Sequence, residues 1–361
     1  MNKYLVKLTP QGKYFFGGDM KFSSGEGKDN PFVSYIIESF KTPQQTSLLG
    51  MLRFLILSND EKAFDRVGNH IIDKEAADKL IGKSSFAVNE DKSSNEFGEI
   101  LSIGSCSICN KVSDKFYFRA ARGHELSIDF SETDIVVVNG INRVIPKMEG
   151  YNPKNSLEDA YISEDGHVLS GDDLPFIEDS RIGINKDYEG KTKDNEDAFY
   201  KQISYRLAKD FCFALEVEIR DVDLSRYSGS IVKLGADDSS FLFEAEEGGL
   251  TYPQDKGKGL RVVLLSDAYL PETPDYVRFA ITDVRPFRFL HSNNSTKASD
   301  YNVKYKKFRS KERYDLYQAG SVFYFENEEG RAKFCELLNS FEDFVQIGYN
   351  RYYGYKKQYK P

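Results

Sequence analysis

The sequence has no tryptophan, only four histidines and four cysteines, and no apolar run long enough to cross a membrane. Four cysteines in 361 residues do not form a disulfide framework, so we expect a reducing, cytoplasmic setting without membrane insertion. No two histidines have the spacing of a helical metal pair, and neither a nucleophile elbow nor a P-loop occurs. These absences predict a protein that is not an enzyme and holds no cofactor.

One cysteine pair has the spacing of a zinc knuckle. Cys106 and Cys109 are separated by two residues and His124 lies downstream, but no second cysteine pair follows. A closed tetrahedral zinc site needs four ligands. We therefore expect no bound metal, and a disulfide between the two cysteines is expected even less in a reducing compartment.

Charge is unevenly distributed along the chain. The net charge is -8, yet residues 301–361 hold twelve Lys and Arg against eight Asp and Glu, which is +4 and leaves -12 on the first 300 residues. Any attraction to nucleic acid must therefore be local. Flat rings are abundant, with 23 Tyr and 27 Phe, and tyrosine rings serve either core packing or base stacking.

The hydrophobic pattern predicts an α+β fold. Thr42 is the expected N-cap of a helix, with Pro43 in its first turn and Gln45 completing a capping box. Asn327 is the expected cap of a second helix. Alternating or continuous apolar residues predict strands at 3–8, 135–138, 214–219, 241–245, 262–265, 277–281, 321–325 and 345–347.

The length exceeds that of a usual single core, so two domains are expected. The stretch from 150 to 197 is polar and has few apolar runs. We therefore predict an N-terminal domain at 1–150, an insertion or interdomain connection at 151–205, and a C-terminal domain at 206–361.

The C-terminal segment 346–357 combines glycines, basic residues and tyrosines. Glycine permits close approach of backbone N–H groups to phosphate, Arg supplies charge, and Tyr rings stack on unpaired bases. The alternative is a final strand whose tyrosines pack on a sheet. The candidate RNA contacts of this segment are Gly348, Asn350, Arg351, Tyr352, Tyr353 and Gly354.

A basic run with interleaved aromatic residues occupies 304–314. This pattern is typical of an RNA-contacting loop or hairpin, although most charge runs are solvated surface. Its candidate contacts are Lys306, Lys307 and Arg309.

Short motifs are spread in order over almost the whole chain. They are Leu8-Thr9-Pro10 with Phe15-Phe16-Gly17-Gly18, the helical segment 43–53, Ser180-Arg181-Ile182-Gly183-Ile184-Asn185, Lys233-Leu234-Gly235-Ala236, Gly320-Ser321-Val322-Phe323-Tyr324-Phe325, and Ile347-Gly348-Tyr349-Asn350 to Gly354. In this order they resemble the RAMP-superfamily subunit that binds the guide handle in type III-B (Cmr) CRISPR effector complexes. One departure is that the segment 233–236 lacks the second glycine of that family.

The resemblance implies a fold, a role and partners. The fold is two ferredoxin-like (RRM-like) domains with insertions, and the role is non-catalytic binding of the 5′ handle of the crRNA. The implied protein partners are the large polymerase-like subunit and the backbone RAMP subunit of the Cmr complex, with target RNA contacted indirectly. The resemblance further implies RNA contacts by Gly17, Gly18, Gln44, Gln45, Thr46, Arg53, Arg181 and Asn185. For Arg53 an ordinary exposed arginine on a helix, without contact to RNA, is an equally good interpretation.

Three other functions stay open at this point. The chain resembles, less specifically, the equivalent subunit of a Csm-type complex. A RAMP endoribonuclease that processes guide precursor would need a His, Lys or Tyr group at the RNA 2′-OH, and histidines are scarce here. A structural scaffold whose basic C-terminus binds protein is the third alternative.

We expect the purified chain to cleave neither guide precursor nor target RNA, with or without Mg²⁺, because the sequence arranges no acid, base or metal set. Denaturing gels of labelled RNA incubated with the protein measure this directly. Specific cleavage that disappears after a single His or Asp substitution would contradict the expectation.

Overall fold

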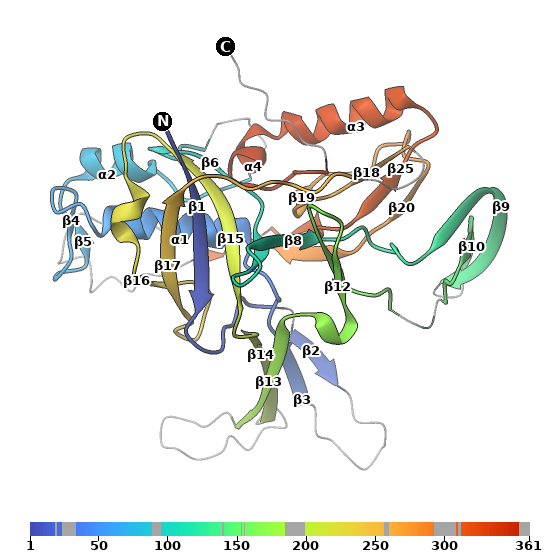
Figure 1. Ribbon diagram of the computed structural model, residues 1–361, viewed down its shortest axis with the longest axis horizontal. Helices are drawn as coiled ribbons and strands as arrows, with labels where there is room; N and C mark the ends of the chain where they lie inside the picture. Colours follow the sequence, from blue (N-terminus) through green and yellow to red (C-terminus); the bar gives the residue numbers. More distant parts are fainter. Residues whose placement is uncertain are drawn as a thin grey trace. The chain divides into compact units, whose positions relative to one another are not determined.

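The computed structural model describes residues 1–18, 20–23, 34–88, 95–138, 141–152, 154, 156–184, 199–255, 260–291, 308–309 and 312–353. Within them many strands and few helices form a mixed α+β protein, which confirms the expected class (Figure 1). Contacts divide the chain into two compact units. Unit 1 comprises Met1–Lys115, Pro175–Leu250 and Arg288–Arg313, and unit 2 comprises Phe116–Leu174, Thr251–Phe287 and Tyr314–Pro361.

Both units are discontinuous in sequence. The observed division therefore differs from the linear one expected at 1–150, 151–205 and 206–361. The polar segment 151–205 is not a plain connection either, because it holds strands that pair with residues outside it. Local composition cannot show this, since each of these strands depends on a partner distant in sequence.

The strands of unit 1 are β1 (Asn2–Pro10), β2 (Met20–Ser23), β3 (Ser34–Glu38), β4 (Phe64–Asp65), β5 (His70–Ile71), β6 (Ile100–Ile103), β7 (Ser107–Asn110), β13 (Phe176–Ile184), β14 (Phe199–Leu207), β15 (Phe211–Ile219), β16 (Ser230–Lys233), β17 (Ser240–Glu247), β22 (Leu290–His291) and β23 (Phe308–Arg309). Its helices are α1 (Gln45–Leu57), α2 (Lys74–Ile81) and the 3-10 turn η2 (Leu224–Tyr227).

Strand β1 lies inside the main antiparallel sheet of unit 1. It pairs with β15 on one side and with β17 on the other, while β6 and β7 pair with β15 and β16 pairs with β17. Tyr4, Val6 and Leu8 are buried on one face of β1 and Leu5 on the other. The expected strand at 3–8 is confirmed, and burial on both faces explains why its apolar residues do not alternate strictly.

A second sheet of unit 1 has the order β13-β14-β3-β2. Strand β14 pairs antiparallel with β13 and parallel with β3. The chain enters this sheet beside the Gly17–Gly18 turn, because the Tyr14 N–H donates to the Tyr205 carbonyl of β14 at 2.8 Å. The sheet is thereby joined to the beginning of the chain.

Helix α1 buries the apolar face that the sequence predicts, including Leu48, Leu52 and Leu55. Its start differs from the prediction, because the N-cap is Gln44 and not Thr42. The Gln45 side chain is buried and its amide donates to the Gly104 carbonyl at 2.8 Å. A contact with a distant loop has therefore replaced the expected capping box.

The strands of unit 2 are β8 (Lys115–Arg119, from the unit boundary), β9 (Ser127–Val138), β10 (Ile141–Glu149), β11 (Ala160–Ser163), β12 (Val168–Ser170), β18 (Arg261–Val263), β19 (Ala268–Tyr269), β20 (Phe279–Ile281), β21 (Val284–Phe287), β24 (Tyr314–Tyr317) and β25 (Val322–Tyr324). Its helices are α3 (Glu328–Ser340), α4 (Glu342–Gln346) and the 3-10 turn η1 (Gly171–Asp173). Strands at or near 135–138, 214–219, 241–245, 262–265, 277–281 and 321–325 are thereby confirmed.

Helix α3 packs on the sheet β18-β25-β20 through Phe334 and Leu338, which share a buried cluster with Phe323 (Figure 1). Its predicted cap is confirmed, because the Asn327 side chain accepts the Gly330 N–H at 2.8 Å. The predicted strand at 345–347 is wrong. Acidic residues begin helix α4 there, and its Phe344 stacks on Tyr269 at 4.8 Å between ring centroids.

Two turns of unit 1 meet although they are far apart in sequence. The Ala236 N–H donates to the Phe15 carbonyl at 2.8 Å. Gly235 has φ +93°, and a Cβ there would lie 2.4 Å from the Phe15 carbonyl oxygen. The neighbouring Phe16 ring stacks on Phe241 at 5.9 Å, which anchors the turn on the main sheet.

We expect Gly235→Ala to lower the free energy of unfolding by well over about 2 kcal/mol, because left-handed strain is joined by a clash with the Phe15 carbonyl. Gly229→Ala is the matched control, since Gly229 has φ +88° but open space around its Cβ position. It should cost only about 1–2 kcal/mol. Urea unfolding of both variants measures the difference, and equal losses would contradict the clash with Phe15.

Candidate nucleic-acid interface

Strands β13 and β14 bring the predicted Arg181 onto a polar sheet face. The register places Arg181 opposite Gln202, Gly183 opposite Tyr200 and Asp179 opposite Ser204. Residues directly opposite each other, and those two positions along, share one face of an antiparallel sheet. An arginine, an amide and a tyrosine therefore lie on the same surface.

The glycine of this motif makes room for an aromatic ring. A Cβ on Gly183 would lie 2.2 Å from the Tyr200 ring, so the ring covers the Gly183 backbone directly. Tyr200 as a whole residue is half-buried. An aromatic ring held in place by the sheet is suited to stacking on a base.

Two arginines on this face share one carboxylate. Asp179 accepts from Arg206 at 2.6 Å and from Arg181 at 3.3 Å, and both arginines are exposed. The hydrogen bond from Arg206, supported by Arg181, holds the pKa of Asp179 below its usual value. The carboxylate therefore stays ionised, and the two guanidinium groups that it holds remain exposed in a position that suits contact with a phosphate.

The predicted glycines Gly17 and Gly18 lie at the end of strand β3, which is part of the same sheet. The Gly17 carbonyl accepts the Phe40 N–H at 2.8 Å. A Cβ on Gly18 would lie 1.5 Å from the Glu38 carbonyl oxygen, so only glycine fits this approach of two backbones. The structure thus brings Gly17, Gly18 and Arg181 to one sheet.

The predicted residues of helix α1 separate into two groups. Gln44 and Thr46 are partly exposed at its start, whereas Gln45 is buried on Gly104. Arg53 donates to the Ser84 and Glu96 carbonyls at 2.8 and 2.6 Å, and burial lowers its pKa to about 10. These contacts give Gln45 and Arg53 a structural role, and their contact with RNA stays a prediction.

The C-terminal loop, the strongest candidate by composition, is folded into unit 2. Asn350 is fully buried, where its amide donates to the Tyr269 and Leu338 carbonyls and its oxygen accepts the Tyr269 N–H. Arg351 is also buried and donates to the Val345 carbonyl at 3.0 Å. The positive φ of Gly348 turns the chain at the end of α4. These residues tie the chain end to the core.

The two candidate tyrosines of this loop take part in the same packing. Tyr352 contacts the α3 cluster and its hydroxyl accepts the Asn339 amide at 3.3 Å. Tyr353 donates its hydroxyl proton to the Arg119 carbonyl at 2.5 Å, and burial raises its pKa. The geometry matches the alternative in which these tyrosines pack on a sheet.

Four predicted contacts lie outside the described residues: Asn185, Lys306, Lys307 and Gly354. Arg309 belongs to β23, where its backbone pairs with Leu290. RNA contact by the basic run 304–314 therefore stays a prediction.

No set of metal ligands is found among the residues that the structure describes. Their His, Cys, Asp and Glu side chains form no group of three that could hold a metal ion. Cys109 lies opposite Cys212 across β7 and β15, and the two form no disulfide. No helix in the described part of the chain is long and apolar enough to cross a membrane.

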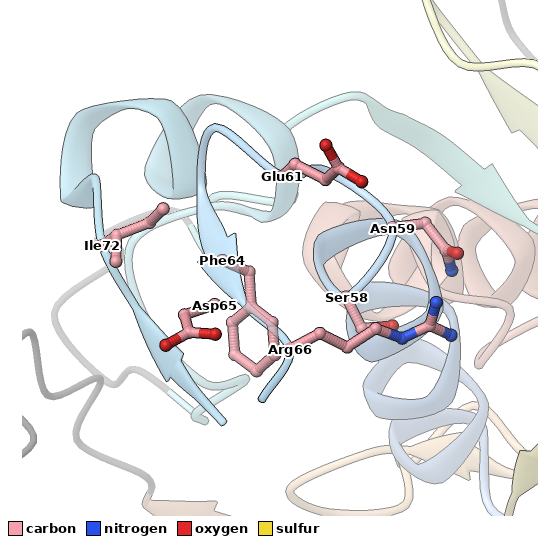
Figure 2. Close-up of a pocket in the computed structure, with 7 residues that line it drawn as sticks. All are labelled: Ser58, Asn59, Glu61, Phe64, Asp65, Arg66 and Ile72. Atoms are coloured by element: carbon pink, nitrogen blue, oxygen red, sulfur yellow. The ribbon is translucent and has the colours of Figure 1, made fainter. Parts of the chain in front are cut away.

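A pocket of about 490 Å³ opens beyond the C-terminal end of α1. Figure 2 shows the Phe64 ring at its centre, with Arg66 beside Ser58 and with Asp65 and Ile72 on the other side of the ring. The Asp65 carboxylate already accepts a local hydrogen bond from the Val67 N–H at 2.9 Å. A pocket of about 260 Å³ in unit 2 is lined by paired charges, among them Arg261 with Asp255 and Arg331 with Glu328.

Comparison with known proteins assigns the family. The model of the family described as CRISPR-associated protein (Cas_Cmr3) matches residues 6–355, which is nearly the whole chain. The chain belongs to this family. The match confirms that the ordered motifs identify a Cmr-type CRISPR subunit.

Other comparisons add little to the Cas_Cmr3 assignment. No curated protein matches the sequence. A chain in the cryo-EM structure of the Type III-B Cmr-beta bound to cognate target RNA is 14% identical, with TM-score 0.48 and coverage of 96% of this chain and 95% of that one. A chain in the crystal structure of a Csm1-Csm4 cassette in complex with pppApA is 12% identical, with TM-score 0.34 and coverage of 90% and 87%. Likenesses this weak establish neither role nor partners.

Some residues of this Cas_Cmr3 member's sheet face were not predicted from the sequence. Tyr200, Gln202 and Arg206 come from β14, which the polar composition around 151–205 concealed. The sequence does hold a signal for this strand, because Ile-Ser-Tyr-Arg-Leu at 203–207 alternates apolar or aromatic with polar residues as a half-exposed strand does. Gly183 and Tyr200 are then natural cross-strand partners, since a large ring often covers a strand glycine.

We expect Asn350→Ala to lower the free energy of unfolding of this Cas_Cmr3 protein by about 2–4 kcal/mol, because three buried hydrogen bonds are removed and alanine must adopt φ +57°. Asn350→Gly is the matched control, which removes the same hydrogen bonds and also relieves the backbone strain. It should be less destabilised than Asn350→Ala in urea. RNA affinity of the folded fraction should not change, and weaker RNA binding without a stability loss would contradict a structural role.

Proposed function

We propose that the chain is a non-catalytic subunit of a type III-B CRISPR interference complex that binds the 5′ handle of the crRNA and docks against the large polymerase-like subunit and the backbone RAMP subunit. In this role target RNA is contacted indirectly, and the chain works in the cytoplasm without a cofactor. The proposal rests on membership of the Cas_Cmr3 family and on the properties of one surface of unit 1.

The observation that carries the proposal is the polar face of β13 and β14. Arg181 and Arg206 share a single carboxylate, and the Tyr200 ring lies over Gly183 on the same face. Exposed guanidinium groups beside a held aromatic ring suit single-stranded RNA, because the guanidinium groups can contact phosphate while the ring stacks on a base.

Two ferredoxin-like domains are part of the proposal. In unit 1 the strand order β17-β1-β15-β6, with α1 between β1 and β6 in sequence, is the order of a ferredoxin-like sheet. The turn η2 stands where the second helix of that fold belongs. In unit 2 helix α3 follows β25 and packs on its sheet, which supports a second, more altered copy.

The main alternatives differ in measurable ways. An equivalent subunit of a Csm-type complex would bind RNA in the same manner but assemble with Csm partners. An endoribonuclease would need a group that reaches the RNA 2′-OH, and His167, whose ring lies 3.3 Å from the Tyr117 hydroxyl, is the place to test by His167→Ala. A scaffold without RNA contacts would show no specific handle affinity, either in the wild type or in any variant of the β13 and β14 face.

We expect Arg181→Ala with Arg206→Ala to weaken binding of a single-stranded handle RNA by about tenfold or more, because two guanidinium groups that face phosphate are removed. The log-log salt dependence of binding should flatten by roughly 0.7 for each phosphate that the variant no longer neutralises. Tyr200→Ala should weaken binding by about 1–3 kcal/mol without flattening that slope, since stacking releases no counterion.

Fluorescence anisotropy at several salt concentrations measures both quantities. Arg331→Ala and Tyr276→Ala are matched controls, because both residues lie in unit 2 and are at least partly exposed. Thermal unfolding of each variant separates weaker affinity from weaker folding. Full handle affinity in the folded arginine and tyrosine variants would overturn the proposed interface.

A further inference from the structure

The hairpin of β9 and β10 in unit 2 is a two-stranded sheet that pairs with no other described strand. An isolated two-stranded hairpin is only marginally stable in water, so both of its strands need packing contacts with other residues. In Figure 1 the hairpin extends outward from the other strands of unit 2. Its two halves are supported very differently.

The base of the hairpin is anchored in the core of unit 2. Ile128, Phe130 and Met148 pack on the buried cluster of Val263, Ile281, Val322 and Tyr324. Arg278 donates to the Phe130 carbonyl at 3.1 Å and lies 4.6 Å from the centroid of its ring. These contacts hold the base of the hairpin against the core of unit 2.

An irregularity separates the base from the distal half. Thr133 pairs with Pro146, but the next residue, Lys147, pairs with Asp129, so residues 130–132 have no partner in β10. A bulge of this kind bends a strand and redirects the residues beyond it. From this point the ribbon leaves the core.

The distal half exposes apolar side chains on one face. Ile135, Val137 and Val144 are 70%, 65% and 70% exposed. The register places Ile135 opposite Val144, and Val137 opposite Asn142, so these residues share a face. Thr133 and Pro146 complete that face, which carries no charge. Exposed β-branched residues gathered on a strand mark a surface that another molecule covers.

The charges on the opposite face of the distal half help to identify the kind of molecule that covers the ribbon. It carries Asp134 and Arg143 together with Val136 and Ile145. Its one acidic and one basic residue cancel, so the ribbon offers no net positive charge to phosphate. The uncharged face with Ile135, Val137 and Val144 therefore calls for an apolar protein surface, whereas Asp134 and Arg143 keep the opposite face partly polar.

The size of the ribbon argues against a symmetric pair. Its two short strands make an arm about 20 Å long and about 10 Å wide. One such face is far smaller than the roughly 800 Å² that each partner contributes to a stable interface. The arm therefore needs a larger partner surface that surrounds it.

We propose that residues 133–138 and 141–146 form a docking arm whose uncharged face packs into an apolar groove on a protein subunit of the same effector complex. The inference rests on the proposed function for the identity of the partner and adds the surface by which the two subunits join. The free backbone edges of β9 and β10 add hydrogen-bonding groups for a partner strand.

The test is Ile135→Thr with Val137→Thr and Val144→Thr, in the full-length chain. Threonine keeps the strand preference of these positions, so the hairpin remains formed while its apolar contacts are removed. The matched control is Val168→Thr with Ile231→Thr and Val284→Thr, which makes the same kind of change at exposed strand positions elsewhere. Circular dichroism and thermal unfolding verify that both triple variants are folded.

Binding is measured to the effector complex reconstituted without this chain. We expect the arm variant to bind at least about tenfold more weakly than wild type, while the control binds normally and both keep wild-type affinity for handle RNA. Equal binding of a folded arm variant would overturn the inference and leave the proposed function standing. Failure of the wild-type chain itself to join the complex would overturn the proposed function and the inference with it.

Two further outcomes also count against the docking arm. A loss confined to RNA affinity would show that the ribbon contacts RNA. A wild-type dimer in light scattering that becomes monomeric in the arm variant would show that a second copy of the chain covers the ribbon.

Discussion

The pairing of β1 with strands more than two hundred residues away is the constraint on which unit 1 depends. Residues 2–8 pair with 213–219, and residues 4–10 pair with 241–247. This arrangement fixes the turn after β1, so that Phe15 meets Ala236 and Tyr14 meets Tyr205. The sheet that carries the candidate interface is thereby held against the main sheet by hydrogen bonds near the start of the chain.

Glycine and arginine have different tasks in the proposed interface. Gly18 and Gly183 remove side chains where a backbone or a ring approaches, and both are required by packing inside the protein. Arg181 and Arg206 remain exposed, because one carboxylate cannot neutralise two guanidinium groups. Arg53 and Arg351 show the opposite case, in which backbone carbonyls bind the side chain and it serves stability. Exposure, more than residue type, separates candidate RNA contacts from structural ones.

The apolar hairpin and the polar sheet face offer the protein two kinds of surface. The β13 and β14 face has two exposed guanidinium groups and an aromatic ring, which suit RNA, whereas the distal half of β9 and β10 has one arginine and no aromatic ring. Strong β-formers such as Ile135 and Val137 ordinarily indicate a core strand, and their pattern correctly predicts a strand at 135–138. Their exposure shows that the chain's own described residues do not cover them.

The amino-acid sequence by itself determined the α+β class, most strands, the two main helices and the family, because alternation, helical spacing, the Asn327 cap and the order of the motifs are local properties. It did not determine the start of α1, the helix at 342–346 or the discontinuous division into units. Those features depend on partners distant in sequence, such as Gly104 for Gln45 and Tyr269 for Phe344.

The candidate RNA contacts divide in the same way. Arg181 was predicted from its motif, but Asn350, Arg351 and Tyr353 had the composition of an RNA-binding loop, and only tertiary structure assigned their hydrogen bonds to the protein interior. Composition specifies which contacts a segment is able to make, whereas burial against the rest of the chain decides which of them it has already made.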